Sequence, residues 1–185
     1  MKHILSSALV ASVAALLAAP VAAHDLRGDR SSFNTNLSGY QETPSTINSA
    51  ATGSFKLRIN RDETAITYEL SYKDLPSAIT QSHIHFGRPA LSGGVVLFLC
   101  TTLTPPAGVP VPPPCPASPA TVTGTLTMAD VLASTGQSID TGAAGFAQIV
   151  KAIRAGAAYA NVHTVGHPSG EIRGALGLDG DDNDD

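Results

Sequence analysis

The chain has 185 residues, only 14% of them charged, and its formal net charge at pH 7 is -4. This length fits one domain with a sizeable core, and the sparse charge and missing Trp favour an extracellular β-rich domain over a helical cytosolic enzyme. An acidic C-terminal stretch supplies much of the negative charge, and the nearly balanced remainder gives no indication of nucleic-acid binding.

Residues 1–23 are predicted to be a secretory signal peptide. Lys2 stands before an apolar run from Ile4 to Ala19, and small residues at 21–23 supply a cleavage site. The run is shorter than the ~20 apolar residues that span a bilayer. The mature chain is therefore expected to be secreted or periplasmic, with no transmembrane segment.

Both ends of the mature chain are expected to lack regular structure. Residues 24–31 are predicted to be a flexible N-terminus, and residues 179–185 a disordered acidic tail. The domain then spans 32–178. Cleavage would place His24 at the new N-terminus, where an amine and an imidazole together form an alternative chelator for copper.

Alternating apolar and polar residues predict β-strands at 33–38, 55–60, 66–72 and 121–126. Residues 95–99 are apolar on both faces, which is typical of a covered central strand.

Two short helices are expected between the later strands. Thr127 can cap a helix that begins at Met128, and a second helix is predicted over 144–155, with Gly156 ending it. Many short strands separated by turns indicate an antiparallel β-sandwich of the immunoglobulin-like or superoxide-dismutase-like kind, with these two helices.

Cys100 and Cys115 are the two cysteines of the chain. In an exported protein they predict one disulfide, closing a loop that contains six prolines. Such a bridge contributes roughly 3 kcal/mol in the chain-entropy model. The alternative is a redox-active pair, although the spacing is far from the two-residue gap of thiol oxidoreductases.

Two polar strands near the middle and end of the chain contain the candidate site. His83 and His85 flank Ile84, so both imidazoles emerge on one face of a strand. If the later strand with Asn161 and His163 lies nearby, three imidazoles form a candidate copper or zinc site, with Asn161 available to orient a ligand. The alternative is a structural network in which the rings only form hydrogen bonds.

Glu171 and Arg173 share a strand face across Ile172. The pattern predicts a structural ion pair, either between the two or with neighbouring strands. The functional alternative is an Arg that recognises a carboxylate or sulfate ligand.

Six motifs follow one another along the chain: Leu37-Ser38-Gly39 with Glu42 and Pro44, Ser82-His83-Ile84-His85, Leu97-Phe98-Leu99-Cys100, Thr123-Gly124-Thr125-Leu126, Tyr159-Ala160-Asn161-Val162-His163-Thr164 and Gly170-Glu171-Ile172-Arg173-Gly174. In this order they resemble a chordin-type (CHRD) domain of the single-domain exported bacterial kind. The resemblance extends from about Phe33 to Leu178.

The resemblance implies an extracellular β-sandwich module without an established catalytic activity. Growth-factor antagonism, the role of the animal protein that names the family, is not expected to carry over to a sequence with one copy of the domain and no cysteine-rich segment. The main expectation is therefore a non-enzymatic binding or structural module with an extracellular protein or polysaccharide as its partner. The alternative is a copper or zinc protein, acting in metal handling or in redox chemistry, that uses His83, His85 and His163.

Overall fold

The structure, a computed structural model, describes residues 30–105 and 107–177. The predicted signal peptide and acidic tail lie outside the described residues, as does most of the predicted N-terminal segment 24–31. Within the described ranges, no helix is long and apolar enough to cross a membrane.

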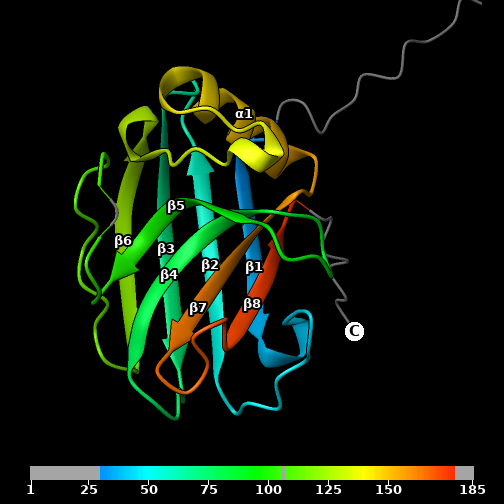
Figure 1. The fold of residues 1–185 in the computed structure, drawn as a ribbon, viewed down its shortest axis with the longest axis vertical. Helices are drawn as coiled ribbons and strands as arrows, with labels where there is room; N and C mark the ends of the chain where they lie inside the picture. Colours follow the sequence, from blue (N-terminus) through cyan, green and yellow to red (C-terminus); the bar gives the residue numbers. More distant parts are fainter. Residues whose placement is uncertain (1–29, 106, 178–185) are drawn as a thin grey trace, which may run out of the picture.

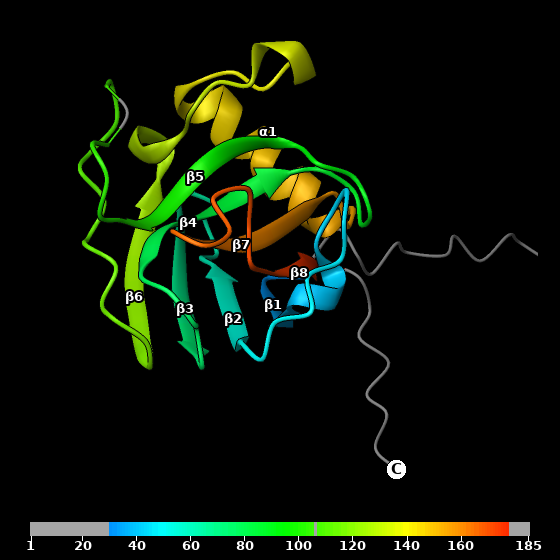
Figure 2. The same cartoon turned by 60° about the horizontal axis from the view of Figure 1, so that its bottom comes forward.

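The described chain contains eight strands in one antiparallel sheet. The strands are β1 (Ser32–Ser38), β2 (Thr52–Ile59), β3 (Ala65–Lys73), β4 (Ile79–Phe86), β5 (Gly94–Thr101), β6 (Ala120–Thr127), β7 (Ala158–Thr164) and β8 (Ile172–Leu176). Their order across the sheet is β5-β4-β7-β8-β1-β2-β3-β6. Figures 1 and 2 show that the sheet curls round until its two ends, β5 and β6, approach each other.

The mostly β prediction is confirmed, but the predicted two-layer sandwich is not, because the strands form one nearly closed barrel. β8 pairs with β1 at Ser38 and Arg173, and this pairing joins two four-stranded halves into a single sheet. Strand periodicity reports which face is buried. It contains no information about whether two halves share a ladder, so the sequence could not distinguish the two architectures.

Two bulges in β5 help to close the barrel. The β4–β5 register skips Leu99 and Val96. The Leu99 carbonyl accepts a 2.6 Å hydrogen bond from the Tyr68 hydroxyl of β3, and the Val96 carbonyl accepts one of 3.0 Å from the Leu132 N–H. β5 is therefore an edge strand and not the central strand that its two apolar faces predicted. At Leu99 and Val96 its free edge bonds to a side chain and a loop, where a complete barrel would have a paired strand.

The core lies inside the barrel. Its largest fully buried side chains come from the inward positions of the strands and from one helix, and they include Phe55, Ile59, Ile66, Leu70, Ile84, Leu97, Leu99, Ile149, Ile153, Ile172 and Leu176. The helix α1 (Gly142–Arg154) covers one end of the barrel (Figure 1). It corresponds to the predicted helix at 144–155, and its buried face contains Phe146, Ile149, Val150 and Ile153 at helical spacing.

The helix predicted at Met128 is wrong. Thr127 and Asp130 do form a capping box, with the Thr127 N–H donating to Asp130 Oδ2 at 2.7 Å, but only a single 3-10 turn (Met128–Asp130) follows. The next residue, Val131, is extended and 2% exposed. Burial of Val131 and the Leu132 hydrogen bond to β5 hold this segment along the barrel edge, which overrides the local helix signal.

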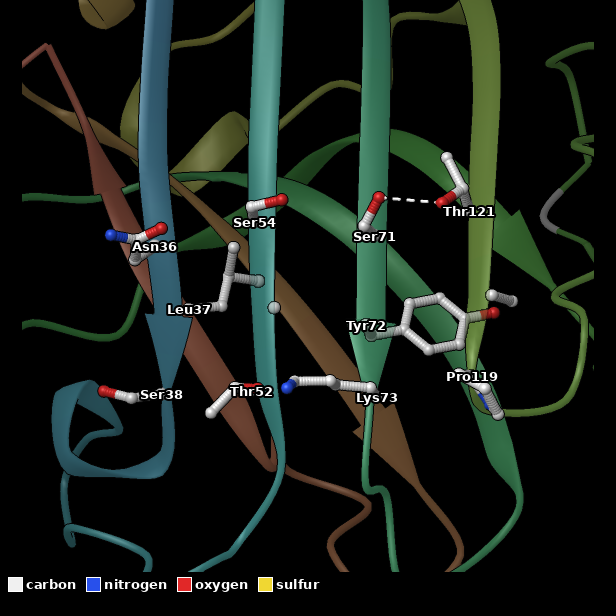
Figure 3. Close-up of a pocket in the computed structure, with 12 residues that line it drawn as sticks. Asn36, Leu37, Ser38, Thr52, Ser54, Ser71, Tyr72, Lys73, Pro119 and Thr121 are labelled. Carbon is white, nitrogen blue, oxygen red and sulfur yellow. Dashed lines mark hydrogen bonds between the residues drawn. The ribbon is translucent and has the colours of Figure 1, made fainter.

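The two halves of the sheet differ on their outer faces. On β1, β2, β3 and β6, strand register aligns Asn36, Ser54, Ser71 and Thr121 in one polar row (Figure 3). A shallow hollow of about 720 Å³ lies at this row. The outer face of β4, β7 and β8 is instead covered by loops, and its polar side chains are buried there.

Candidate metal centre

His83, His85 and His163 come together on the covered outer face of β4 and β7. Strand alternation places Ile84 in the core with 0% exposure and the two flanking imidazoles on the opposite face. In the antiparallel register His163 lies opposite Gln81, and it is therefore the diagonal neighbour of His83. One ring nitrogen from each of the three lies within 4.8 Å of the others.

Neighbouring aromatic rings enclose the imidazoles. The three histidines are 2%, 8% and 6% exposed in chain order. Phe98 of β5 meets His83 edge-on with the ring centroids 4.2 Å apart, and Tyr159 of β7 stacks on His85 at 4.7 Å with 4° between the ring planes. These contacts remove most rotamer freedom from His83 and His85.

Two backbone carbonyls fix the tautomers of His85 and His163. The Nδ1 atom of His85 lies 3.0 Å from the Gly93 carbonyl oxygen, and the Nδ1 atom of His163 lies 3.0 Å from the Pro168 carbonyl oxygen. A carbonyl oxygen only accepts, so both Nδ1 atoms carry the hydrogen and both Nε2 atoms present a lone pair. Metal-ligating histidines typically donate their second N–H in this way.

The remaining ring nitrogens are poorly satisfied. The Nε2 atoms of His83 and His85 are buried and have no hydrogen-bond partner among the described residues. The His83 Nδ1 atom lies 3.3 Å from His163 Nε2, which is long for a hydrogen bond between two nitrogens. It matches the ~3.3 Å that separates two ligands of a tetrahedral zinc ion whose Zn–N bonds are about 2.0–2.1 Å.

Burial keeps all three imidazoles neutral. It lowers the pKa of His83 to about 2 and the pKa of His85 to about 4, and it also lowers the pKa of His163. Neighbouring imidazoles lower the pKa of His83 and His85 further, whereas the Gly93 carbonyl opposes the shift of His85. Neutral imidazole is the form that binds a metal, so no proton has to be displaced at pH 7.

Asn161 lies beside the site with a partner of its own. The sequence predicted that it could orient an imidazole, but the Asn161 amide donates a 2.7 Å hydrogen bond to Glu42 Oε1. Glu42 is 6% exposed, and burial raises the pKa of its carboxyl to about 7 despite the opposing effects of Asn161 and Arg173. The Gly93 and Pro168 carbonyls orient the rings of His85 and His163 instead, and backbone groups in loops leave no recognisable signal in a sequence.

Glu171 holds the loop between β1 and β2. Its buried carboxylate accepts hydrogen bonds of 2.6 Å from both the Ser49 hydroxyl and the Thr164 hydroxyl. Ser49 belongs to the segment that carries Glu42, so Glu171 and Asn161 anchor the same loop at two points.

Arg173 holds two loops together. Its guanidinium donates to the Thr43 hydroxyl and to the Arg88 and Leu91 carbonyls, the last at 2.6 Å. In the described structure, Arg173 and Glu171 have these separate partners and form no ion pair with each other. Their common effect is to fasten loops over the histidine cluster.

The predicted disulfide lies away from the histidine cluster in the sequence and is present in the structure. Cys100 of β5 and Cys115 form the expected disulfide, which ties the proline-rich segment to the barrel edge. His167, on the turn between β7 and β8, is not a member of the histidine cluster found in the described chain. Tyr159 gave no functional signal in the sequence, although it stood within the motif of the family resemblance.

The comparisons with known proteins identify the family. No curated protein and no solved structure matches the chain. A model of the CHRD domain matches residues 33–176, which covers most of the chain and the whole described barrel except its outermost residues. The protein therefore belongs to the CHRD-domain family, and its family and disulfide fit an extracellular location.

Proposed function

We propose that this protein is an exported, non-enzymatic CHRD-domain module that binds one copper or zinc ion through His83, His85 and His163. The observation that carries the proposal is the convergence of three neutral, buried imidazoles whose ligand atoms lie within 4.8 Å of one another. Imidazole suits both metals, and three histidines leave one coordination position for water or an external ligand.

The unpaired nitrogens favour a metal site over a purely structural network. In a structural network each buried ring nitrogen would have a hydrogen-bond partner, because an unpaired buried polar group costs about 1–3 kcal/mol. Two of the ring nitrogens lack one within the described ranges. A metal ion held by the cluster would satisfy the unpaired Nε2 of His85, and the Nδ1–H groups of His85 and His163 already donate to carbonyls, as expected of metal-ligating rings.

The ion would supply a buried positive centre with an open coordination position. Copper would also make redox chemistry available, and this is the enzymatic alternative that the identity of the metal decides. Export through cleavage of the segment 1–23 is part of the proposal. The family and the disulfide support it.

Metal content tests the proposal. Untagged protein is incubated with zinc or copper, desalted and subjected to elemental analysis, and we expect roughly one ion per chain. His83→Ala and His85→Ala should abolish retention while circular dichroism shows an intact fold. His167→Ala is the matched control and should retain the ion.

A wild-type protein that retains no metal would contradict the proposal. Retention that disappears with His24→Ala but survives the cluster substitutions would instead assign the metal to the chain terminus.

A second role, binding of polysaccharide, is favoured by the uncovered polar row on β1, β2, β3 and β6 (Figure 3). Its hydroxyl and amide groups can exchange hydrogen bonds with sugar hydroxyls. Retention on immobilised polysaccharide tests this role, and it should be lost in Ser71→Glu. Equal retention of wild type and variant would contradict it.

A further inference from the structure

A stack of three buried side chains ends on the histidine cluster. The guanidinium carbon of Arg173 lies 3.4 Å from the centroid of the Tyr159 ring. His85 stacks on the same Tyr159 ring, with the ring centroids 4.7 Å apart and the planes only 4° apart. Strand register creates the contact, since Tyr159 lies directly opposite His85 in the β4–β7 ladder.

Gly93 couples the two rings through its backbone. Its N–H donates to the Tyr159 hydroxyl at 3.1 Å, and its carbonyl accepts from His85 Nδ1 at 3.0 Å. A displacement of the Tyr159 ring would therefore alter both the stacking face of His85 and the carbonyl that fixes its tautomer.

The guanidinium of Arg173 is itself held in place. Its two terminal nitrogens donate to Thr43, Arg88 and Leu91, and Arg173 as a whole is 3% exposed. Three of its N–H donors are occupied within the protein, so the arrangement does not favour the role of binding a carboxylate or sulfate. The planar group instead presents its face to Tyr159.

We infer that Arg173, acting through the Tyr159 ring, is a positioning residue that holds His85 with its Nε2 lone pair directed at the other two imidazoles. The inference rests on the proposed metal function. The loop contacts of Arg173 have a role in this arrangement. The loops that cover the site hold the guanidinium, the guanidinium holds the Tyr159 ring, and the Tyr159 ring holds His85.

Zinc affinity and a cobalt spectrum test the inference. Arg173→Gln and Tyr159→Leu should each weaken zinc binding about 10- to 100-fold, the range for groups that orient metal ligands. The visible absorption of the cobalt-loaded protein should shift, because it reports ligand geometry. Arg154→Gln is the matched control, since Arg154 is a half-buried arginine on α1 that binds Glu63, and it should leave both readouts unchanged.

Milder variants cover the case in which these substitutions prevent folding. Arg173→Lys keeps the charge and loses the planar face, and Tyr159→Phe keeps the ring and loses the hydroxyl. We expect a weaker site and a shifted cobalt spectrum in both. Wild-type zinc affinity and an unshifted spectrum in the folded variants would overturn the inference while leaving the proposed function intact.

Nuclear magnetic resonance of the metal-free protein distinguishes a failure of the proposed metal function from a failure of the positioning role of Arg173 and Tyr159. Nitrogen shifts of His85 should report the Nδ1–H tautomer in the wild type and in Arg154→Gln, and a mixture in Tyr159→Leu. If the wild type bound no metal, the proposed function would fail, and this tautomer change would still support positioning by the stack. An unchanged tautomer would overturn it.

Discussion

At the scale of single residues, Gly170 packs tightly against the Asn161 and Glu42 side chains beside the histidine cluster. Its φ is +128°, and a Cβ at this position would lie 2.7 Å from Asn161 Oδ1 and 2.8 Å from Glu42 Oε2. Only glycine can adopt this positive φ and fit into this space without strain.

Gly170→Ala is therefore expected to lower the free energy of unfolding by about 1–3 kcal/mol. Gly136→Ala is the matched control, because a Cβ there meets nothing within 4 Å and φ lies outside the strained range. It should be neutral or stabilising by up to about 1 kcal/mol. Urea denaturation measures both, and equal stabilities of the two variants would contradict this reading of Gly170.

The histidine pKa values predict loss of stability in acid. Burial lowers the pKa of His83 to about 2 and that of His85 to about 4, below the ordinary value of 6.5. As the pH falls below 6.5 the unfolded chain binds protons that the folded chain does not, so the free energy of unfolding decreases. Glu42 changes the free energy of unfolding in the opposite direction. Because its pKa is raised to about 7 in the folded chain, its contribution to stability is lost as the pH rises from 4.5.

The variant His83→Phe tests the contribution of one imidazole to this pH dependence. In metal-free protein between pH 6.5 and 4, its unfolding free energy should depend on pH less steeply than that of the wild type, by up to about 1.4 kcal/mol per pH unit. Denaturation curves at several pH values provide the measurement. Parallel dependences in the two proteins would show that His83 titrates normally in the folded state.

At the scale of elements, a side chain of β3 helps to close the seam between the two end strands of the sheet, β5 and β6. The Tyr68 hydroxyl bonds the Leu99 carbonyl at 2.6 Å in a buried position, where a bulge has turned that carbonyl out of the β4–β5 ladder. Removal of the hydroxyl leaves a buried acceptor without its donor.

Tyr68→Phe should therefore cost about 1–3 kcal/mol of unfolding free energy. Tyr40→Phe is the control: the Tyr40 hydroxyl bonds Asn48 at the surface and the residue is 68% exposed, so the cost should be close to zero. Guanidinium denaturation compares the two. A Tyr68→Phe variant as stable as Tyr40→Phe would mean that this contact does not hold the seam.

Element prediction succeeded where local periodicity and burial agree. The alternation that gave β2 and β3 from Phe55 to Tyr72, and the apolar stripe of α1, both report a buried face directly. The Met128 helix failed because its capping signal was genuine but the following residue, Val131, is drawn into the core. A local signal cannot reveal that competition.

At the scale of the whole molecule, the site depends on how distant strands pair. Alternation placed His83 and His85 on one face from the sequence alone. The arrival of His163 beside them requires the β4–β7 register, and burial of the cluster requires loops that Arg173 and Glu171 fasten from β8 and the residue before it. The sequence therefore identified the three candidate histidines, whereas the surroundings that orient their rings depend on tertiary structure.

The difference between a barrel and a sandwich has the same origin. The two halves of the sheet meet through a ladder of one register pair between β1 and β8 and through the bulged edge of β5. In this single curled sheet, the outer face of β1, β2, β3 and β6 is polar and exposed. Loops cover the outer face of β4, β7 and β8. The histidine cluster belongs to the covered half, which explains why its polar groups are buried outside the main core.

The most direct test of the central claim is X-ray absorption at the zinc edge of the loaded protein. Three imidazole nitrogens at about 2.0–2.1 Å, with one further light ligand, are predicted. The His85→Ala variant should lose this spectrum, and His167→Ala should keep it. A coordination shell dominated by oxygen, or one that depends on His24, would contradict a metal centre made of His83, His85 and His163.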